Sequence, residues 1–213
     1  MKLYTYYRST AAFRVRIALN LKGVPFESVT MHLRTGAHRT PEFLALNPQG
    51  LIPALDDDGV VISQSLAIIE YLEEKFPSPS LLPGTVADRA HIRSMALAVA
   101  ADMHPLNNLR VLNFLRGPLA QDDKAINDKW YQHWIAEGFR GLEQQAMRWS
   151  GDGKHMFGTG VTLADVYILP QMYNALRFHC DLASYPTLRR ICRHLESLPA
   201  FIKAAPELQP DSE

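Results

Sequence analysis

An arginine and two hydroxyl side chains stand together near the start of the chain, where an apolar run gives way to a helical pattern. They are Arg8, Ser9 and Thr10, in the stretch YYRSTAAFRVRIAL. A serine or threonine at a helix start commonly caps the backbone N–H groups that lack intrahelical partners. The same helix end binds anions, and a hydroxyl that donates to a bound sulfur favours the thiolate. These residue types therefore allow two interpretations, a structural cap or a thiolate-binding site.

Two later segments could hold a peptide-like ligand. Ile52-Pro53 opens a predicted strand, where the proline is either an ordinary strand-start residue or part of a cis bond that turns the Ile52 backbone toward an extended ligand. Gln64-Ser65 precedes a helical pattern. Ser65 can cap that helix, while the N–H groups of the helix start can receive a ligand carboxylate.

Polar residues in the second half of the chain have roles that depend on which way they face. His104 and Asn108 are four residues apart, so they share a helix face if the helix continues past Pro105. Arg110 and Arg177 are ordinary solvated residues unless they face a ligand. In that case an arginine binds a carboxylate through two parallel hydrogen bonds.

Two other patterns are interpreted as structural. Thr162 and Asp165 have the spacing of a helix capping box and carry no predicted chemistry. Cys180 and Cys192 are predicted in helical segments without clustered histidines, which favours buried thiols over metal ligands. No metal site is predicted.

Composition narrows the class of protein. The 213 residues are 47% hydrophobic and 21% charged, as in an ordinary globular protein. Lys+Arg and Asp+Glu both number 22, so net charge gives no reason to expect nucleic acid or an anionic membrane as a partner. No apolar run is long enough to span a bilayer. Two cysteines make no disulfide framework and fit a reducing compartment, so a cytoplasmic location is expected.

Short strands and helices alternate over the first third of the chain. Strands are predicted over residues 2–7 and 26–31, on either side of a helix over residues 12–21. A short helix over 41–46 is followed by a hairpin with strands at 51–55 and 60–62, and then by a helix from about residue 65. This order, βαβ-α-ββα, is that of a thioredoxin-like domain, in which the first and third helices start on the same face. That convergence favours the binding interpretation of Ser9 and Gln64-Ser65 over capping alone.

A proline-rich stretch over residues 76–84 predicts a domain linker. Beyond it, helical patterns run over 87–116 and 123–149, and further helices begin near residues 163 and 187, with no predicted strand. The expected fold class is an α/β thioredoxin-like N-terminal domain plus an all-α C-terminal domain. The expected boundaries are 1–80 for the first domain and 86–213 for the second.

Together these motifs make the chain resemble a cytosolic glutathione transferase of the zeta class, which includes maleylacetoacetate and maleylpyruvate isomerases. YYRSTAAFRVRIALNLKG resembles the zeta active-site segment, ALNPQGLIPAL its cis-proline loop and QSLAIIEYLEEKFP its glutathione-carboxylate segment. TLADVYILPQ and RFHCDLASYPTL resemble the C-terminal pattern, so the resemblance covers essentially the whole chain. It implies a homodimer with glutathione as cofactor.

The resemblance also implies a role for each candidate residue. Ser9 would hydrogen-bond the glutathione sulfur, with Thr10 as a helper and Arg8 facing a substrate carboxylate. His38 would contact the glycyl end of glutathione, and Ile52 would use its backbone. The remaining implied cofactor-site residues are Gln49, Gln64, Ser65, His104 and Asn108, and Arg110 and Arg177 join Arg8 in binding a small-molecule dicarboxylate substrate.

The implied activity is glutathione-dependent cis–trans isomerisation of a maleyl keto acid, maleylpyruvate or maleylacetoacetate, to its fumaryl isomer in aromatic-compound catabolism. Many zeta enzymes carry Ser-Ser-Cys after the arginine, whereas this chain has Ser9-Thr10-Ala11. Chemistry that needs that cysteine is lost, but isomerisation needs only the glutathione thiolate. Maleylpyruvate isomerases of the family also lack the cysteine, which tilts the expectation toward maleylpyruvate.

Two rival functions belong to other classes. Conjugation or dehalogenation of α-halo acids would need Ser9 but not three arginines directed at carboxylates. A non-catalytic binding module would have no use for the glutathione-site residues Ser9 and Gln64-Ser65, whose presence argues against it.

Overall fold

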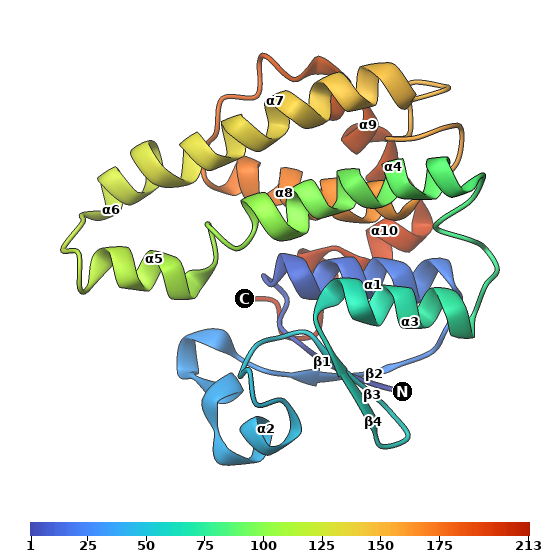
Figure 1. The fold of residues 1–213 in the computed structure, drawn as a ribbon. Coiled ribbons are helices and arrows are strands. Elements are labelled where there is room, and N and C mark those ends of the chain that lie inside the picture. The colour runs from blue at the N-terminus through green and yellow to red at the C-terminus, as the bar shows by residue number, and fades with distance from the viewer. The chain divides into compact units, whose positions relative to one another are not determined.

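The computed structural model describes residues 1–213, which divide into two compact units. The first unit consists of residues 1–80 together with 197–213, and the second of residues 81–196. The first unit contains the β-sheet, and the second is built from helices (Figure 1).

The sheet has four strands in the order β2-β1-β3-β4. These are β1 (Lys2–Thr5), β2 (Glu27–Thr30), β3 (Ala54–Asp57) and β4 (Val60–Ser63). β1 pairs parallel with β2, while β3 runs antiparallel to both β1 and β4. A parallel pair needs a crossover, which α1 provides, and an Asp-Gly turn at residues 58–59 closes the hairpin. The predicted thioredoxin-like order is confirmed.

Helices cover both faces of this sheet. α1 (Thr10–Leu21) and α3 (Ser65–Lys75) lie side by side on one face (Figure 1). α2 (Pro41–Leu46) follows two short 3₁₀ turns, η1 (Leu33–Thr35) and η2 (Ala37–Arg39). α2 lies on the other face, where the ring of Phe43 is 5.6 Å from that of Tyr4. The predicted helix over 41–46 is therefore confirmed.

The end of the chain belongs to the first unit and not, as expected, to the helical one. α10 (Pro199–Ala204) packs on α1, and η5 (Pro206–Leu208) follows it. Phe201 and Ala204 are fully buried there, and the amide of Asn20 donates to the Ala200 carbonyl at 3.0 Å. Residues 197–213 group with the first unit because these apolar side chains are buried on α1.

The second unit surrounds α8 (Leu163–Arg177), which is buried along almost its whole length. α4 (Val86–Leu97), its π-helical continuation η3 (Ala98–Met103) and α9 (Pro186–Leu195) pack on it. α6 (Asp123–Ala125), the π-helical segment η4 (Ile126–Tyr131) and α7 (Gln132–Trp149) follow α5 (Leu109–Arg116). A Cβ at Gly138 would lie 2.0 Å from the Met103 sulfur, so only glycine lets α7 approach η3 so closely. The predicted capping box of Thr162 and Asp165 starts α8.

The predicted continuous helix over 87–116 is wrong. η3 ends at Met103, and Asn108 has an extended backbone and begins α5 instead of continuing the first helix. The Asn108 side chain accepts from the N–H of Arg110 at 3.1 Å, an N-cap that competes with an unbroken helix. His104 and Asn108 therefore do not share a helix face.

The prediction that both cysteines lie in helices is half wrong. Cys192 is buried in α9, but Cys180 lies half-buried in the loop after α8. Burial raises the pKa of Cys180 to about 11, so its thiol is protonated at neutral pH. No group of His, Cys, Asp and Glu side chains is arranged to hold a metal ion. None of the helices combines the length and apolar character needed to cross a membrane.

Candidate functional site

Strand direction brings three of the predicted segments to one edge of the sheet. The pairing register sets Tyr4 opposite Ala54, and Ala54 opposite Ser63, in one row across β1, β3 and β4. β1 and β4 run in the same direction, so the helices that follow them both begin at this edge. Pro53 immediately precedes Ala54 and therefore reaches the same edge from the loop before β3. Ser9, Ile52 and Ser65 converge there.

Ser9 is the N-cap of α1. Its backbone is extended, and its Oγ accepts a hydrogen bond from the N–H of Ala12 at 3.2 Å. Thr10 is the first helical residue and is buried. Because the Ser9 hydroxyl is half-exposed and its proton is not used in this cap, it can still donate to a ligand at the positive end of the helix. The two interpretations of Ser9 are compatible.

Arg8 lies half-exposed beside this cap. Its guanidinium carbon is 5.0 Å from the centre of the Tyr7 ring, a cation–π contact. Arg8 takes part in none of the salt bridges of the chain. A cation without an acidic partner is suited to bind an external carboxylate.

The loop before β3 is held by an internal side chain. The Ile52–Pro53 bond is cis, as the sequence allowed. The Asn47 amide donates to the Leu51 carbonyl at 2.7 Å, and its carbonyl oxygen accepts from the N–H of Gln49 at 3.2 Å. Ile52 lies outside the strand ladder, which begins at Ala54, so the sheet does not use its backbone groups. They can pair with an extended ligand.

The residue that precedes α3 has a backbone conformation that is unusual for a residue other than glycine. Gln64, its N-cap, has φ +72°, a left-handed region that L residues other than glycine rarely occupy. Such strain is concentrated at functional sites. The side-chain amide nitrogen of Gln64 donates to the side-chain Oε1 of Gln49 at 2.8 Å, and this bond joins the α3 start to the loop before β3. Ser65, with 7% of its surface exposed, follows as the first helical residue. The predicted cap at Ser65 is therefore wrong, because the helix begins one residue earlier than a Ser65 cap requires.

His38 lies next to the same loop. A Cβ on Gly50, which has φ +56°, would lie 3.1 Å from the His38 carbonyl oxygen and 2.8 Å from an Arg39 nitrogen, so glycine permits this close approach. Burial, reinforced by the charge of Arg39, lowers the pKa of His38, and its imidazole is neutral at neutral pH. The His38 Nδ1 atom is buried and has no hydrogen-bond partner.

These residues fit a tripeptide thiol such as glutathione. The helix start at Ser9 suits a thiolate, and the Ile52 backbone lies outside the ladder and suits an extended peptide. The α3 start at Ser65 suits a carboxylate. The buried Nδ1 of His38, which has no hydrogen-bond partner within the chain, can bond a polar group of the ligand.

The remaining predicted residues lie in the second unit. Asn108 caps α5, and His104 is the residue that follows η3. Arg110 and Arg177 are both exposed, and the Arg177 guanidinium carbon is 4.9 Å from the centre of the Phe178 ring. Within this unit, Tyr131 contacts both the residue that precedes Asn108 and the residue that follows Arg177. Its ring stacks on Phe178 at 3.7 Å, and its carbonyl accepts from the Asn107 amide at 3.3 Å.

Three residues in contact with the candidate site were not predicted from the sequence. Arg14 and Arg16 are both 1% exposed, and Asp211 bonds the backbone of Tyr7. The available signal was the pair of arginines within the apolar pattern of α1, at positions where a helix normally buries aliphatic residues. Asp211 gave no local signal, because its partner is distant in the sequence.

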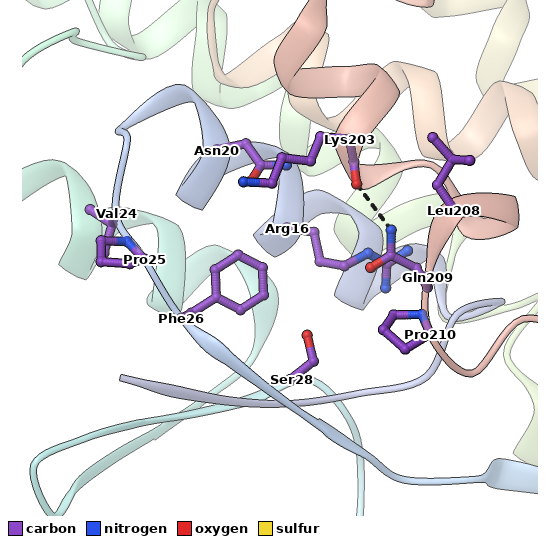
Figure 2. A pocket seen from close by; sticks show the side chains of 10 residues that line it. All are labelled: Arg16, Asn20, Val24, Pro25, Phe26, Ser28, Lys203, Leu208, Gln209 and Pro210. Carbon is purple, nitrogen blue, oxygen red and sulfur yellow. Dashed lines mark hydrogen bonds between the residues drawn. The ribbon is translucent and has the colours of Figure 1, made fainter.

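A surface cavity of about 350 Å³ lies elsewhere in the first unit, and none of the predicted site residues line it. It is bordered by α1, the loop before β2 and the segment after α10 (Figure 2). The amides of Asn20 and Gln209 that line it already donate to main-chain carbonyls. We therefore interpret the cavity as a packing gap between these elements and not as a binding site.

Comparison with known proteins places the site in context. The family profile for the glutathione S-transferase N-terminal domain matches residues 8–75. A probable maleylacetoacetate isomerase of Vibrio cholerae is 48% identical over 99% of this chain and 97% of its own length.

Solved structures are similar over the whole chain. A holo maleylpyruvate isomerase, described as a bacterial glutathione S-transferase of the zeta class, has a TM-score of 0.97 and 46% identity, with full coverage of both chains. A maleylacetoacetate isomerase from Methylobacterium extorquens, solved with malonate and glutathione bound, has a TM-score of 0.95 and 40% identity, again with full coverage of both chains.

Proposed function

The chain belongs to the zeta class of the glutathione transferases, and we propose that it is a glutathione-dependent isomerase that converts a maleyl keto acid to its fumaryl isomer. The substrate is maleylpyruvate or maleylacetoacetate, an intermediate of aromatic-compound catabolism. Relatives at 46–48% identity carry both names.

One observation carries this proposal more than any other. Ser9, Ile52 and Ser65 come from three separate segments, and the strand register brings all three to one edge of the sheet. A lone capped helix needs no such convergence. A ligand with a sulfur, an extended peptide backbone and a carboxylate uses all three.

The proposed roles follow from these positions. When bound, glutathione would supply the thiolate nucleophile for reversible addition to the cis double bond, which permits rotation about the resulting single bond. The Ser9 hydroxyl donates a hydrogen bond to the sulfur, which stabilises the thiolate. Thr10 is proposed to assist Ser9 at the positive end of the helix. The peptide is held by the Ile52 backbone, by Gln49, Gln64 and Ser65, and by His38 at its glycyl end.

Three arginines are proposed to bind the substrate carboxylates. Arg8, Arg110 and Arg177 make no salt bridges within the chain, so their charges are available to a dianionic substrate. Their positive charge would also stabilise the negative charge that develops on the substrate during addition. The Methylobacterium extorquens relative was solved with the dicarboxylate malonate. His104 and Asn108 are proposed to lie near the bound cofactor.

We propose that residues 1–80 bind glutathione and that the helices between residues 86 and 195 supply the substrate-binding part. A homodimer is proposed from family membership. Edge strand β4 supports it, because Val60 and Val61 are 55% and 38% exposed in the single chain. Two free thiols support a cytoplasmic location.

A spectrophotometric isomerase assay tests the function. Maleylpyruvate, maleylacetoacetate and an α-halo acid are each supplied with and without glutathione. We expect isomerisation of at least one maleyl substrate only when glutathione is present. Turnover of the halo acid alone would favour the transferase alternative, and failure to bind glutathione in a calorimetric titration would favour a binding module.

A further inference from the structure

The turn that carries Arg8 and Ser9 extends beyond the strand ladder. β1 pairs with β2 only as far as Thr5 and with β3 only as far as Tyr4. The following residues form a tight turn in which the N–H of Ser9 donates to the carbonyl of Tyr6 at 2.9 Å. At one end of this turn the cap of α1 holds Ser9, and contacts from outside the strand ladder hold the residues before it.

Arg16 supplies contacts from within α1. Its side chain is almost fully buried, and its guanidinium donates to the carbonyls of Tyr6 and Tyr7 at 3.4 and 3.1 Å. The same group donates to the Thr5 hydroxyl at 3.0 Å and to the Ala204 carbonyl at 3.1 Å. A planar guanidinium presents its donors in fixed directions, so Arg16 orients two successive peptide groups of the turn.

Asp211 holds the turn through a third backbone group. Its carboxylate accepts from the N–H of Tyr7 at 3.0 Å. Tyr7 is thus held at its N–H by Asp211 and at its carbonyl by Arg16, directly before Arg8 and Ser9. The bond to a carboxylate is charge-assisted and stronger than a neutral one.

The segment that presents Asp211 is itself folded. The Gln209 amide donates to the carbonyls of Lys203 and Ala205 at 3.1 and 2.8 Å, and the first of these bonds is drawn in Figure 2 beside Arg16. Two residues beyond Asp211, Glu213 pairs with His32 at 2.7 Å and with Arg34. Residues 204–213 are therefore anchored on both sides of Asp211.

We propose that Arg16 and Asp211 are positioning residues for the reaction, which together hold the Tyr6–Ser9 turn so that the Ser9 hydroxyl points at the sulfur. This inference rests on the proposed function and adds two residues to it. Loss of the Asp211 carboxylate loosens the turn and weakens the hydrogen bond from Ser9 to sulfur. The groups proposed to bind the peptide part of glutathione lie on other elements and are left in place.

The experiment measures enzyme-bound glutathione directly. The fraction present as thiolate is followed by its ultraviolet absorbance as pH is varied, in the wild type, Asp211→Ala and Asp211→Asn. We expect Asp211→Ala to raise the pKa of the bound thiol by about one unit or more and to lower kcat about tenfold near neutral pH. The Kd of glutathione should change by less than about threefold, since positions 52, 64 and 65 keep their contacts.

The second variant and a matched control separate positioning from general damage. Asp211→Asn keeps an acceptor oxygen for the Tyr7 N–H and should restore part of the thiolate fraction. Glu207→Ala removes an exposed acid from the same segment and should change neither quantity.

Wild-type thiolate fraction and kcat in a folded Asp211→Ala variant would overturn the proposal. Unfolding of both Asp211 variants would also overturn it, because the contact would then support the whole unit. A wild-type enzyme that fails to bind glutathione would instead overturn the proposed function.

Discussion

The side chain of Arg14 donates to the Ser65 hydroxyl at 3.4 Å, and so connects α1, the helix capped by Ser9, with the first residue of α3. The two helix starts at the sheet edge are thus joined by a side chain as well as by the strand register. Arg14 is almost completely buried, so the position of its donor is fixed by packing.

Arg14→Met should weaken glutathione binding. Removal of this donor takes away a buried contact of the Ser65 hydroxyl, and we expect the Kd of glutathione to rise about tenfold, or about 1.4 kcal/mol. Isothermal titration calorimetry measures this, with Arg140→Met, an exposed arginine on α7, as control. Equal glutathione affinity in the wild type and Arg14→Met would show that the contact of Arg14 with Ser65 does not contribute to glutathione binding.

Gln64→Gly should raise the stability of the protein and at the same time weaken its binding of glutathione. The positive φ at Gln64 costs a non-glycine residue about 1 kcal/mol, so glycine should raise the free energy of unfolding by a similar amount. The same change removes the bond to Gln49 and should weaken glutathione binding.

Asp58→Gly is the matched control, since Asp58 has φ +53° in the hairpin turn away from the site. It should stabilise the protein without changing glutathione affinity. Urea unfolding and calorimetry measure the two quantities, and unchanged affinity in Gln64→Gly would remove Gln64 from the proposed site.

Arg8→Ala should impair catalysis and not cofactor binding. Loss of the cation removes a partner of a substrate carboxylate, and we expect KM to rise or kcat to fall by at least about tenfold, about 1.4 kcal/mol. Glutathione affinity should remain that of the wild type. Arg189→Ala on α9 serves as an exposed control, and unchanged isomerase kinetics in Arg8→Ala would contradict the carboxylate-binding role.

Asp57 should contribute to stability in a pH-dependent way. Hydrogen bonds from Lys75 and Tyr71 lower the pKa of this carboxyl below its ordinary value. Because the folded pKa lies below the unfolded value of about 3.9, this stabilisation is present above that pH and is lost as pH falls through the folded pKa.

Asp57→Asn should therefore lower the unfolding free energy at pH 7, and its difference from the wild type should shrink below about pH 4. Urea unfolding at several pH values measures the difference, with Glu74→Gln as the control. A difference that does not change with pH would assign the effect to packing.

Much of the fold was predictable because its signals are local. The alternation of strands and helices, the Asp-Gly turn and the caps at Ser9 and Thr162 depend on neighbouring residues. The break after Met103 was not predicted, because an N-cap at Asn108 outweighed a periodic apolar pattern that continues through the break.

Contacts between distant residues were not predictable in the same way. The placement of residues 197–213 depends on burial of α10 against α1, and the site contacts of Arg14, Arg16 and Asp211 join residues far apart in the chain. The proposed site residues came from the family resemblance. The strand register explained why they meet.

Ser9 is proposed to stabilise the glutathione thiolate on which isomerisation depends. The most direct test of this role is the steady-state kcat of Ser9→Ala with saturating glutathione and a maleyl keto acid, beside Ser28→Ala, an exposed serine on β2. We expect Ser9→Ala to lose at least about a hundredfold in kcat, about 2.7 kcal/mol, and Ser28→Ala to match the wild type. A folded Ser9→Ala enzyme with wild-type kcat would contradict the proposed role of Ser9 in stabilising the thiolate.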